Sequence, residues 1–124
     1  MSLVELQPLE PVLVLDLFPG ERSALLEALR SLTEEQWARP TACEGWSIKD
    51  IAQHLLADDL GRLSRGRDAW PGVFQPTGTD AFEAELLAFI NRQNEVWVEA
   101  TRRLSPLIVI DLLEWSGRET QGLL

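Results

Sequence analysis

The stretch that decides the fold reads Pro40-Thr41-Ala42-Cys43-Glu44-Gly45-Trp46-Ser47-Ile48-Lys49-Asp50-Ile51-Ala52-Gln53-His54-Leu55-Leu56. Gly45 and Trp46 end a loop, and Ser47 is a good N-cap for a helix with Asp50 in its first turn, where the helix dipole favours a carboxylate. The helix is expected to run to about Arg65 and to carry His54, the only histidine in the chain. Its inward stripe is expected to consist of Ile48, Ile51, Leu55 and Leu56.

Outward from this helix, the spacing of apolar residues predicts three more main helices. The first spans about 19–32, and a capping box at Thr33-Glu34-Glu35-Gln36 then predicts a short turn of helix that carries Trp37. Another capping box at 80–83 opens a long helix to about Leu104. A fourth begins at Ser105, with Pro106 at its first position. The inward residues expected on the last two helices are Phe82, Leu86, Ile90, Trp97, Ala100 and Leu104, followed by Leu107, Ile110, Leu113 and Trp115.

Prolines and glycines mark the segments outside these helices. Residues 1–18 are predicted to be an extended arm, because Pro8 and Pro11 each lack a backbone N–H and push the preceding residue out of the helical region. Residues 66–78 are predicted to be a long loop that Trp70 and Phe74 pin to the bundle. With 124 residues in total, the sequence therefore indicates one helical-bundle domain over residues 19–124.

Composition excludes several classes of function. The net charge of −9 and a pI near 4.5 argue against nucleic-acid binding and against an anionic membrane surface, both of which need a concentrated basic face. The longest apolar run near the amino terminus, Val12 to Leu15, is too short to span a bilayer. No signal peptide is recognised and only one cysteine is present, so the protein is expected to be cytoplasmic.

The main basic cluster alternates with acidic residues. Its pattern indicates a solvated helix face with local ion pairs, and an arginine that contacts an anionic ligand is the alternative interpretation. The cluster comprises Arg62, Arg65 and Arg67 with Asp58, Asp59 and Asp68. Cys43 is expected to pack as a small apolar residue under Trp46, and a thiolate near the helix amino terminus is the alternative.

His54 carries the sharpest chemical hypothesis. Asp50 and Asp58 lie one turn before and one turn after it, so all three can share a helix face. His54 is either a metal ligand, with Asp58 as a second ligand or as an acceptor that fixes the imidazole tautomer, or a boundary residue, with Asp58 paired to Arg62. A catalytic metal normally needs about three protein ligands, and no second histidine is available. No catalytic residue or cofactor-binding residue can be assigned from motifs, and the five tryptophans are most simply core and loop anchors.

Several segments together resemble a known family. They are Leu32–Trp37, Pro40-Thr41, Cys43–Ile51 and His54–Leu56. They are similar to the amino-terminal domain of mycothiol-dependent maleylpyruvate isomerases, which belong to the DinB-like metalloenzymes. The resemblance is strongest over residues 24–68, with weaker support from Asn94, Trp97 and the segment that begins at Leu104.

The resemblance implies an all-α, up-and-down bundle of four main helices. In this family a histidine of the second helix binds a divalent metal, zinc or nickel, together with a glutamate and a histidine of a later helix. His54 matches the first ligand. The other two have no counterpart before Leu124, so the last core helix and the metal site are expected to be incomplete. The metal is expected to activate a low-molecular-weight thiol of the mycothiol type.

Two functions remain open. The first is a thiol-dependent isomerase or transferase that acts on a small molecule once a later helix completes the site. The second is a non-catalytic helical interaction module. In either case a homodimer is expected, in which a partner chain covers the apolar stripe near Leu113 and Leu124.

Overall fold

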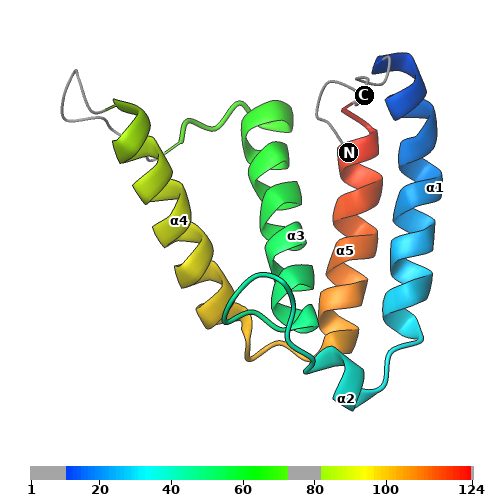
Figure 1. Cartoon of the computed structure of the whole chain (residues 1–124). Helices are drawn as coiled ribbons and strands as arrows, with labels where there is room; N and C mark the ends of the chain where they lie inside the picture. The colour runs from blue at the N-terminus through cyan, green and yellow to red at the C-terminus, as the bar shows by residue number, and fades with distance from the viewer. Residues whose placement is uncertain (1–10, 73–81, 124) are drawn as a thin grey trace, which may run out of the picture.

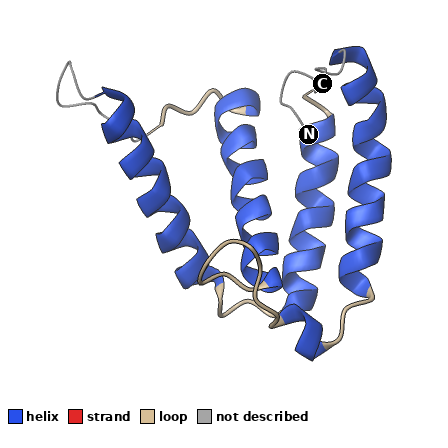
Figure 2. Cartoon of the chain, viewed as in Figure 1, coloured by secondary structure: helices blue, strands red, loops and turns tan. Residues whose placement is uncertain are grey.

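The computed structural model describes residues 11–72 and 82–123. Within these ranges the chain folds into four long helices and one short one, without a β-strand. The helices are α1 (Pro11–Arg30), α2 (Glu34–Trp37), α3 (Ile48–Arg62), α4 (Phe82–Thr101) and α5 (Pro106–Gln121), and a π-helical turn, η2 (Leu63–Arg67), continues α3. The expected all-α bundle is therefore confirmed (Figure 2).

The four long helices alternate in direction along the chain, as an up-and-down bundle requires (Figure 1). In space they follow a different order. α5 packs against both α3 and α1, and α4 packs against α3, so α1 and α4 are the outer helices of a row (Figure 1). The central helices α3 and α5 run in the same direction.

The starts predicted for α2, α3 and α5 are confirmed by their caps, whereas the cap predicted at Asp80 lies outside the described residues. The Thr33 side chain accepts a hydrogen bond from the Gln36 backbone in a complete capping box, and Ser47 does the same with Asp50. Ser105 accepts from the Ile108 backbone, with Pro106 at the first helical position. Each cap satisfies backbone donors that the first turn of a helix leaves unpaired.

The apolar core lies where α1, α2, α3 and α5 meet. Its buried residues are Leu26, Leu29, Trp37, Ala52, Leu56, Val109, Ile110 and Leu113. A fully buried leucine contributes roughly 1.5–3 kcal/mol relative to an exposed one, so this cluster is the main source of stability. α4 adds the buried Val98 and the half-buried Trp97 on its α3 side.

The extended arm predicted for residues 1–18 is wrong over 11–18, because α1 already begins at Pro11. Proline is compatible with the first helical turn, where its missing N–H would have no intrahelical partner. The prolines therefore do not delay the helix to Pro19, which lies inside α1. Residues 1–10 lie outside the described ranges.

Several expected inward residues face solvent instead. Trp70 is 68% exposed and so does not pin the 66–78 loop; Phe74 lies outside the described residues. On α5, Leu107 is 72% exposed and Trp115 is 39% exposed. Phe82 and Ile90 of α4 are also exposed. No described helix is both long and apolar enough to cross a membrane.

Candidate functional site

The loop between α2 and α3 positions Trp46 over α3. The backbone N–H of Thr41 donates to the Trp46 carbonyl at 3.1 Å, and the backbone N–H of Ile48 donates to the Arg39 carbonyl at 3.0 Å. The Thr41 hydroxyl also donates to the Trp46 carbonyl at 2.8 Å. Gly45 adopts φ +82°, a left-handed conformation that glycine reaches without strain. The loop therefore turns back sharply and places Trp46 against α3, the helix that follows the loop.

The imidazole of His54 lies between Trp46 and Asp58. The Trp46 and His54 rings are in contact, with centroids 5.3 Å apart and planes tilted by 42°. Nε2 of His54 lies 3.6 Å from Oδ2 of Asp58, and the two side chains are 24% and 54% exposed. The predicted shared helix face of His54 and Asp58 is thus present, and Asp58 faces the histidine.

Two ring nitrogens at this contact have no hydrogen-bond partner in the described part of the chain. They are Nδ1 of His54 and Nε1 of Trp46, and both atoms are buried. Buried polar side-chain atoms are nearly always paired with protein or water. The orphaned nitrogens therefore mark this contact as an unusual polar position in the bundle.

Asp50, the third residue of the predicted helix face, is hydrogen-bonded to residues other than His54. Its carboxylate accepts from the Ser47 backbone at 3.0 Å and from Arg102 at 3.1 and 3.4 Å. Burial raises the pKa of the Asp50 carboxyl, but the hydrogen bonds from Arg102 and Ser47 outweigh burial and hold that pKa below its usual value. Asp50 therefore joins the start of α3 to the end of α4 and does not serve His54.

The fit of these residues to a metal ion is partial. Two ligands of a tetrahedral zinc at about 2.0–2.2 Å lie roughly 3.3–3.6 Å apart, so the 3.6 Å between Nε2 and Oδ2 suits a shared ion. However, no group of three or more histidine, cysteine, aspartate or glutamate side chains in the described ranges is placed to hold one. The described residues thus offer two ligands at this position, His54 and Asp58.

The interleaved charges form fewer local pairs than the pattern predicts. Arg67 pairs with its neighbour Asp68 at 2.8 Å and with the distant Glu119 at 3.2 Å. Asp59 turns inward and pairs with Arg22 of α1.

Cys43 is exposed, so the prediction that it packs under Trp46 is wrong. The loop directs only the indole toward α3 and leaves the thiol in solvent.

Sequence reasoning missed two buried polar ties between helices. Asp59 accepts two hydrogen bonds from Arg22 and one, at 2.6 Å, from Ser116. The Gln53 amide donates to Val98 O and Thr101 Oγ1 at 2.9 and 2.7 Å. A polar residue at an inward helical position is the one local feature of the sequence that indicates such buried hydrogen bonds, and it does not identify their partner.

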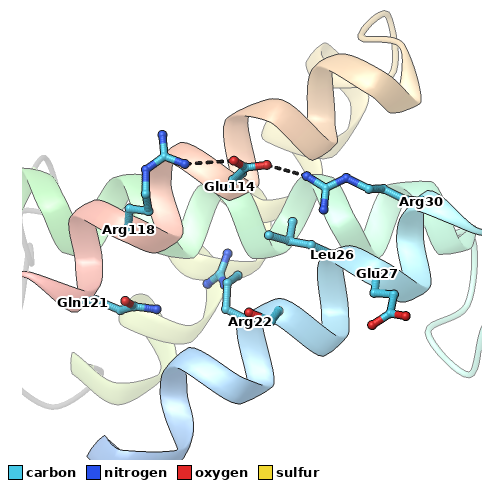
Figure 3. Close-up of a pocket in the computed structure, with 8 residues that line it drawn as sticks. Arg22, Leu26, Glu27, Arg30, Glu114, Arg118 and Gln121 are labelled. Atoms are coloured by element: carbon cyan, nitrogen blue, oxygen red, sulfur yellow. Dashed lines mark hydrogen bonds and ion pairs between the residues drawn. The ribbon is translucent and has the colours of Figure 1, made fainter.

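Two surface grooves lie away from His54. One, of about 620 Å³, runs between α1 and α5, and in it Glu114 bridges Arg30 and Arg118 (Figure 3). The other, of about 390 Å³, is bordered by Trp37, Lys49 and Arg102 among others. Burial lowers the pKa of Lys49, with Asp50 acting in the opposite direction. Lys49 donates to Gln53 Oε1 and to the Arg102 carbonyl, so its ammonium group is part of the α3–α4 contact.

Comparison with known proteins places the chain in a family. No curated protein and no solved structure matches the sequence significantly. The family model described as the mycothiol maleylpyruvate isomerase N-terminal domain matches residues 18–122. This range includes every described helix in whole or in large part. The chain therefore belongs to the mycothiol maleylpyruvate isomerase N-terminal domain family, consistent with the DinB-like superfamily.

Proposed function

We propose that this protein is a thiol-dependent isomerase or transferase domain, acting on a small molecule, in which His54 supplies one ligand to a divalent metal. The observation that carries the proposal is the pairing of Nε2 of His54 with the Asp58 carboxylate, at a spacing that suits one shared cation. Family membership supports the same assignment. The proposal places the domain in the cytoplasm, where a free cysteine remains reduced.

The accessible edge of the imidazole favours Nε2 as the coordinating atom. Nδ1 is buried, whereas Asp58 is about half exposed, so a cation from solvent reaches the Nε2 side first. Zinc or nickel at this position would act as a Lewis acid that favours the thiolate form of a low-molecular-weight thiol. The protein's own contribution is to fix the ring, through the contact with Trp46 on one side and Asp58 one helical turn away.

The remaining ligands must come from outside the described residues. A later helix of a longer chain or a second copy of this chain would supply them. A metal held by His54 and Asp58 alone is therefore expected to bind weakly.

Because His54 is the only histidine, its imidazole NMR signals need no sequence-specific assignment, and they test the proposal directly. Zinc titrated into the protein is expected to shift the Nε2 signal, and Asp58→Asn is expected to weaken binding at least tenfold. Asp111→Asn is the matched control, since Asp111 is an exposed aspartate of α5. Imidazole signals that zinc leaves unmoved would rule out the metal role.

The second candidate, a non-catalytic dimerisation module, is favoured by one observation. The apolar stripe predicted near Leu113 is wrong at that residue, because Leu113 is fully buried in the core, and Leu124 lies outside the described residues. α5 instead exposes Leu107, Ile108, Leu112 and Trp115 on the side opposite its buried residues. A homodimer through this stripe predicts concentration-dependent sedimentation that Leu112→Glu abolishes, while Leu87→Glu on the exposed side of α4 does not. Only monomer at high concentration would count against it.

A further inference from the structure

The groove between α1 and α5 has the size and the lining of a small-molecule site. Its volume of about 620 Å³ falls within the roughly 300–1,000 Å³ of such sites, which combine apolar lining with a few polar groups. Leu26, which is only 7% exposed, supplies apolar lining, and Ser23 and Gln121 add a hydroxyl and an amide. Both helices therefore contribute to a hollow that an organic molecule can enter.

Arginine is concentrated in this groove, although the chain as a whole has a net charge of −9. The lining includes Arg22, Arg30 and Arg118. Arg22 is neutralised by the buried carboxylate of Asp59, at 2.9 and 3.1 Å. Arg30 and Arg118 share the single carboxylate of Glu114, which lies between their guanidinium groups (Figure 3). These last three side chains therefore carry one positive charge in excess.

Arg30 and Arg118 also keep most of their hydrogen-bonding capacity. A guanidinium group has five N–H donors, and the Glu114 carboxylate accepts one hydrogen bond from each arginine. Within the described ranges, neither guanidinium group donates to another residue. The two side chains are 49% and 63% exposed, and Glu27, the other acidic residue of the lining, points away from them (Figure 3). The remaining donors are therefore accessible to a ligand.

We propose that this groove binds a small phosphate monoester. Its phosphoryl group takes the place of the Glu114 carboxylate between Arg30 and Arg118, and its apolar part covers Leu26. A phosphoryl group of this kind carries roughly −1.5 to −2 charges at pH 7, so it neutralises both guanidinium groups, whereas the carboxylate neutralises one. Guanidinium groups also match phosphate geometry through pairs of parallel hydrogen bonds. Glu114 is 43% exposed, so its carboxylate can turn to water when the phosphate enters.

Calorimetric titration with phenyl phosphate tests the proposal, at low ionic strength because salt screens exposed charges. Phenyl phosphate is expected to bind more tightly than benzoate, which has the same ring and a single charge, and more tightly than inorganic phosphate, which has no apolar part. Arg30→Gln and Arg118→Gln are each expected to weaken its binding about tenfold, the loss typical of one charge-assisted hydrogen bond. Arg92→Gln is the matched control, since it removes the same charge from an exposed position of α4. Exposed ion pairs contribute little to stability, so all these variants are expected to keep the fold.

Glu114→Gln distinguishes a ligand site from ion pairs that only join two helices. In a ligand site this substitution removes the competing carboxylate, so phenyl phosphate is expected to bind about tenfold more tightly. Asp111→Asn, which removes a negative charge from an exposed position of α5, is expected to have little effect. Unchanged or weaker binding in Glu114→Gln overturns the proposal, as does phenyl phosphate that binds no better than benzoate or not at all. The groove is separate from His54, so neither outcome bears on the metal role.

Discussion

Arg22 of α1 and Asp59 of α3 form a two-pronged ion pair across the bundle, with Nη–Oδ distances of 2.9 and 3.1 Å. Asp59 is 4% exposed in its side chain and also accepts from Ser116 of α5. Arg22 donates further to the Leu113 carbonyl. These two residues therefore join three helices through one buried carboxylate.

Asp59→Asn is expected to lower the free energy of unfolding by about 3 kcal/mol, the lower end of the range for breaking a buried pair, because Arg22 keeps some access to water. Urea unfolding measures the change. Asp58→Asn, one residue away and about half exposed, should change stability by less than about 0.5 kcal/mol. Equal losses of unfolding free energy in the two variants would show that the buried ion pair does not stabilise the protein.

Gly117→Ala is expected to destabilise the protein although alanine is the better helix former. A Cβ at Gly117 would come within 3.0 Å of Cγ, Cδ and Nε of Arg22, and the ion pair with Asp59 prevents Arg22 from moving aside. The crowding should cost about 1–3 kcal/mol. In the control Gly61→Ala, the new methyl meets only the end of Arg65 at 3.3 Å, so that variant should gain roughly 0.5–1 kcal/mol. Thermal unfolding of both distinguishes crowding from helix propensity.

Acidification should weaken the contact between α3 and α4. The pKa of Asp50 is lowered in the folded state, so its contribution to stability is fully present above the unfolded value, about 3.9. That contribution is lost as pH falls through the lower folded pKa. Asp50→Asn should therefore be less stable than the wild type near neutral pH, with the difference shrinking below about pH 4. Urea unfolding at a series of pH values measures this difference in the free energy of unfolding. A difference that stays constant as the pH falls would contradict the role given to the Asp50 carboxylate. Asp111→Asn serves as the control.

Gln53→Ala should loosen α4 selectively. Gln53 is fully buried and bonds to Val98 and Thr101 of α4, and α3 is the main neighbour of that helix. Hydrogen exchange is expected to speed up in α4 more than in α1 or α5, because local opening needs less free energy than global unfolding. Gln93→Ala, on the exposed side of α4, should leave exchange unchanged. Hydrogen exchange that speeds up equally in all helices would show that the hydrogen bonds of Gln53 do not stabilise α4 in particular.

Local signals predicted the helices well. Thr33, Ser47 and Ser105 each cap the helix expected of them, because an N-cap depends on residues within one turn. The start of α1 was wrong for a related reason, since proline is allowed in a first turn as well as before one.

Contacts between distant residues could not be predicted in the same way. Arg22 and Asp59 are 37 residues apart, and Asp50 and Arg102 are 52 apart; no local periodicity specifies such pairs. For the candidate site, the sequence placed Asp50 and Asp58 on either side of His54 along one helix, but nothing in it indicated that Asp50 pairs with Arg102. The burial of His54 Nδ1 and Trp46 Nε1 depends on how the loop folds back, which only the three-dimensional arrangement defines.

The exposed thiol of Cys43 lies on the loop that delivers Trp46 to the helix. It is the only thiol in the chain, so a maleimide fluorophore or nitroxide will attach at this position without any mutagenesis. Such a label would respond to displacement of the indole, and its paramagnetic broadening of the His54 resonances would report how far the loop travels when ligands are added. The chain thus carries its own attachment point for following the position of this loop relative to His54.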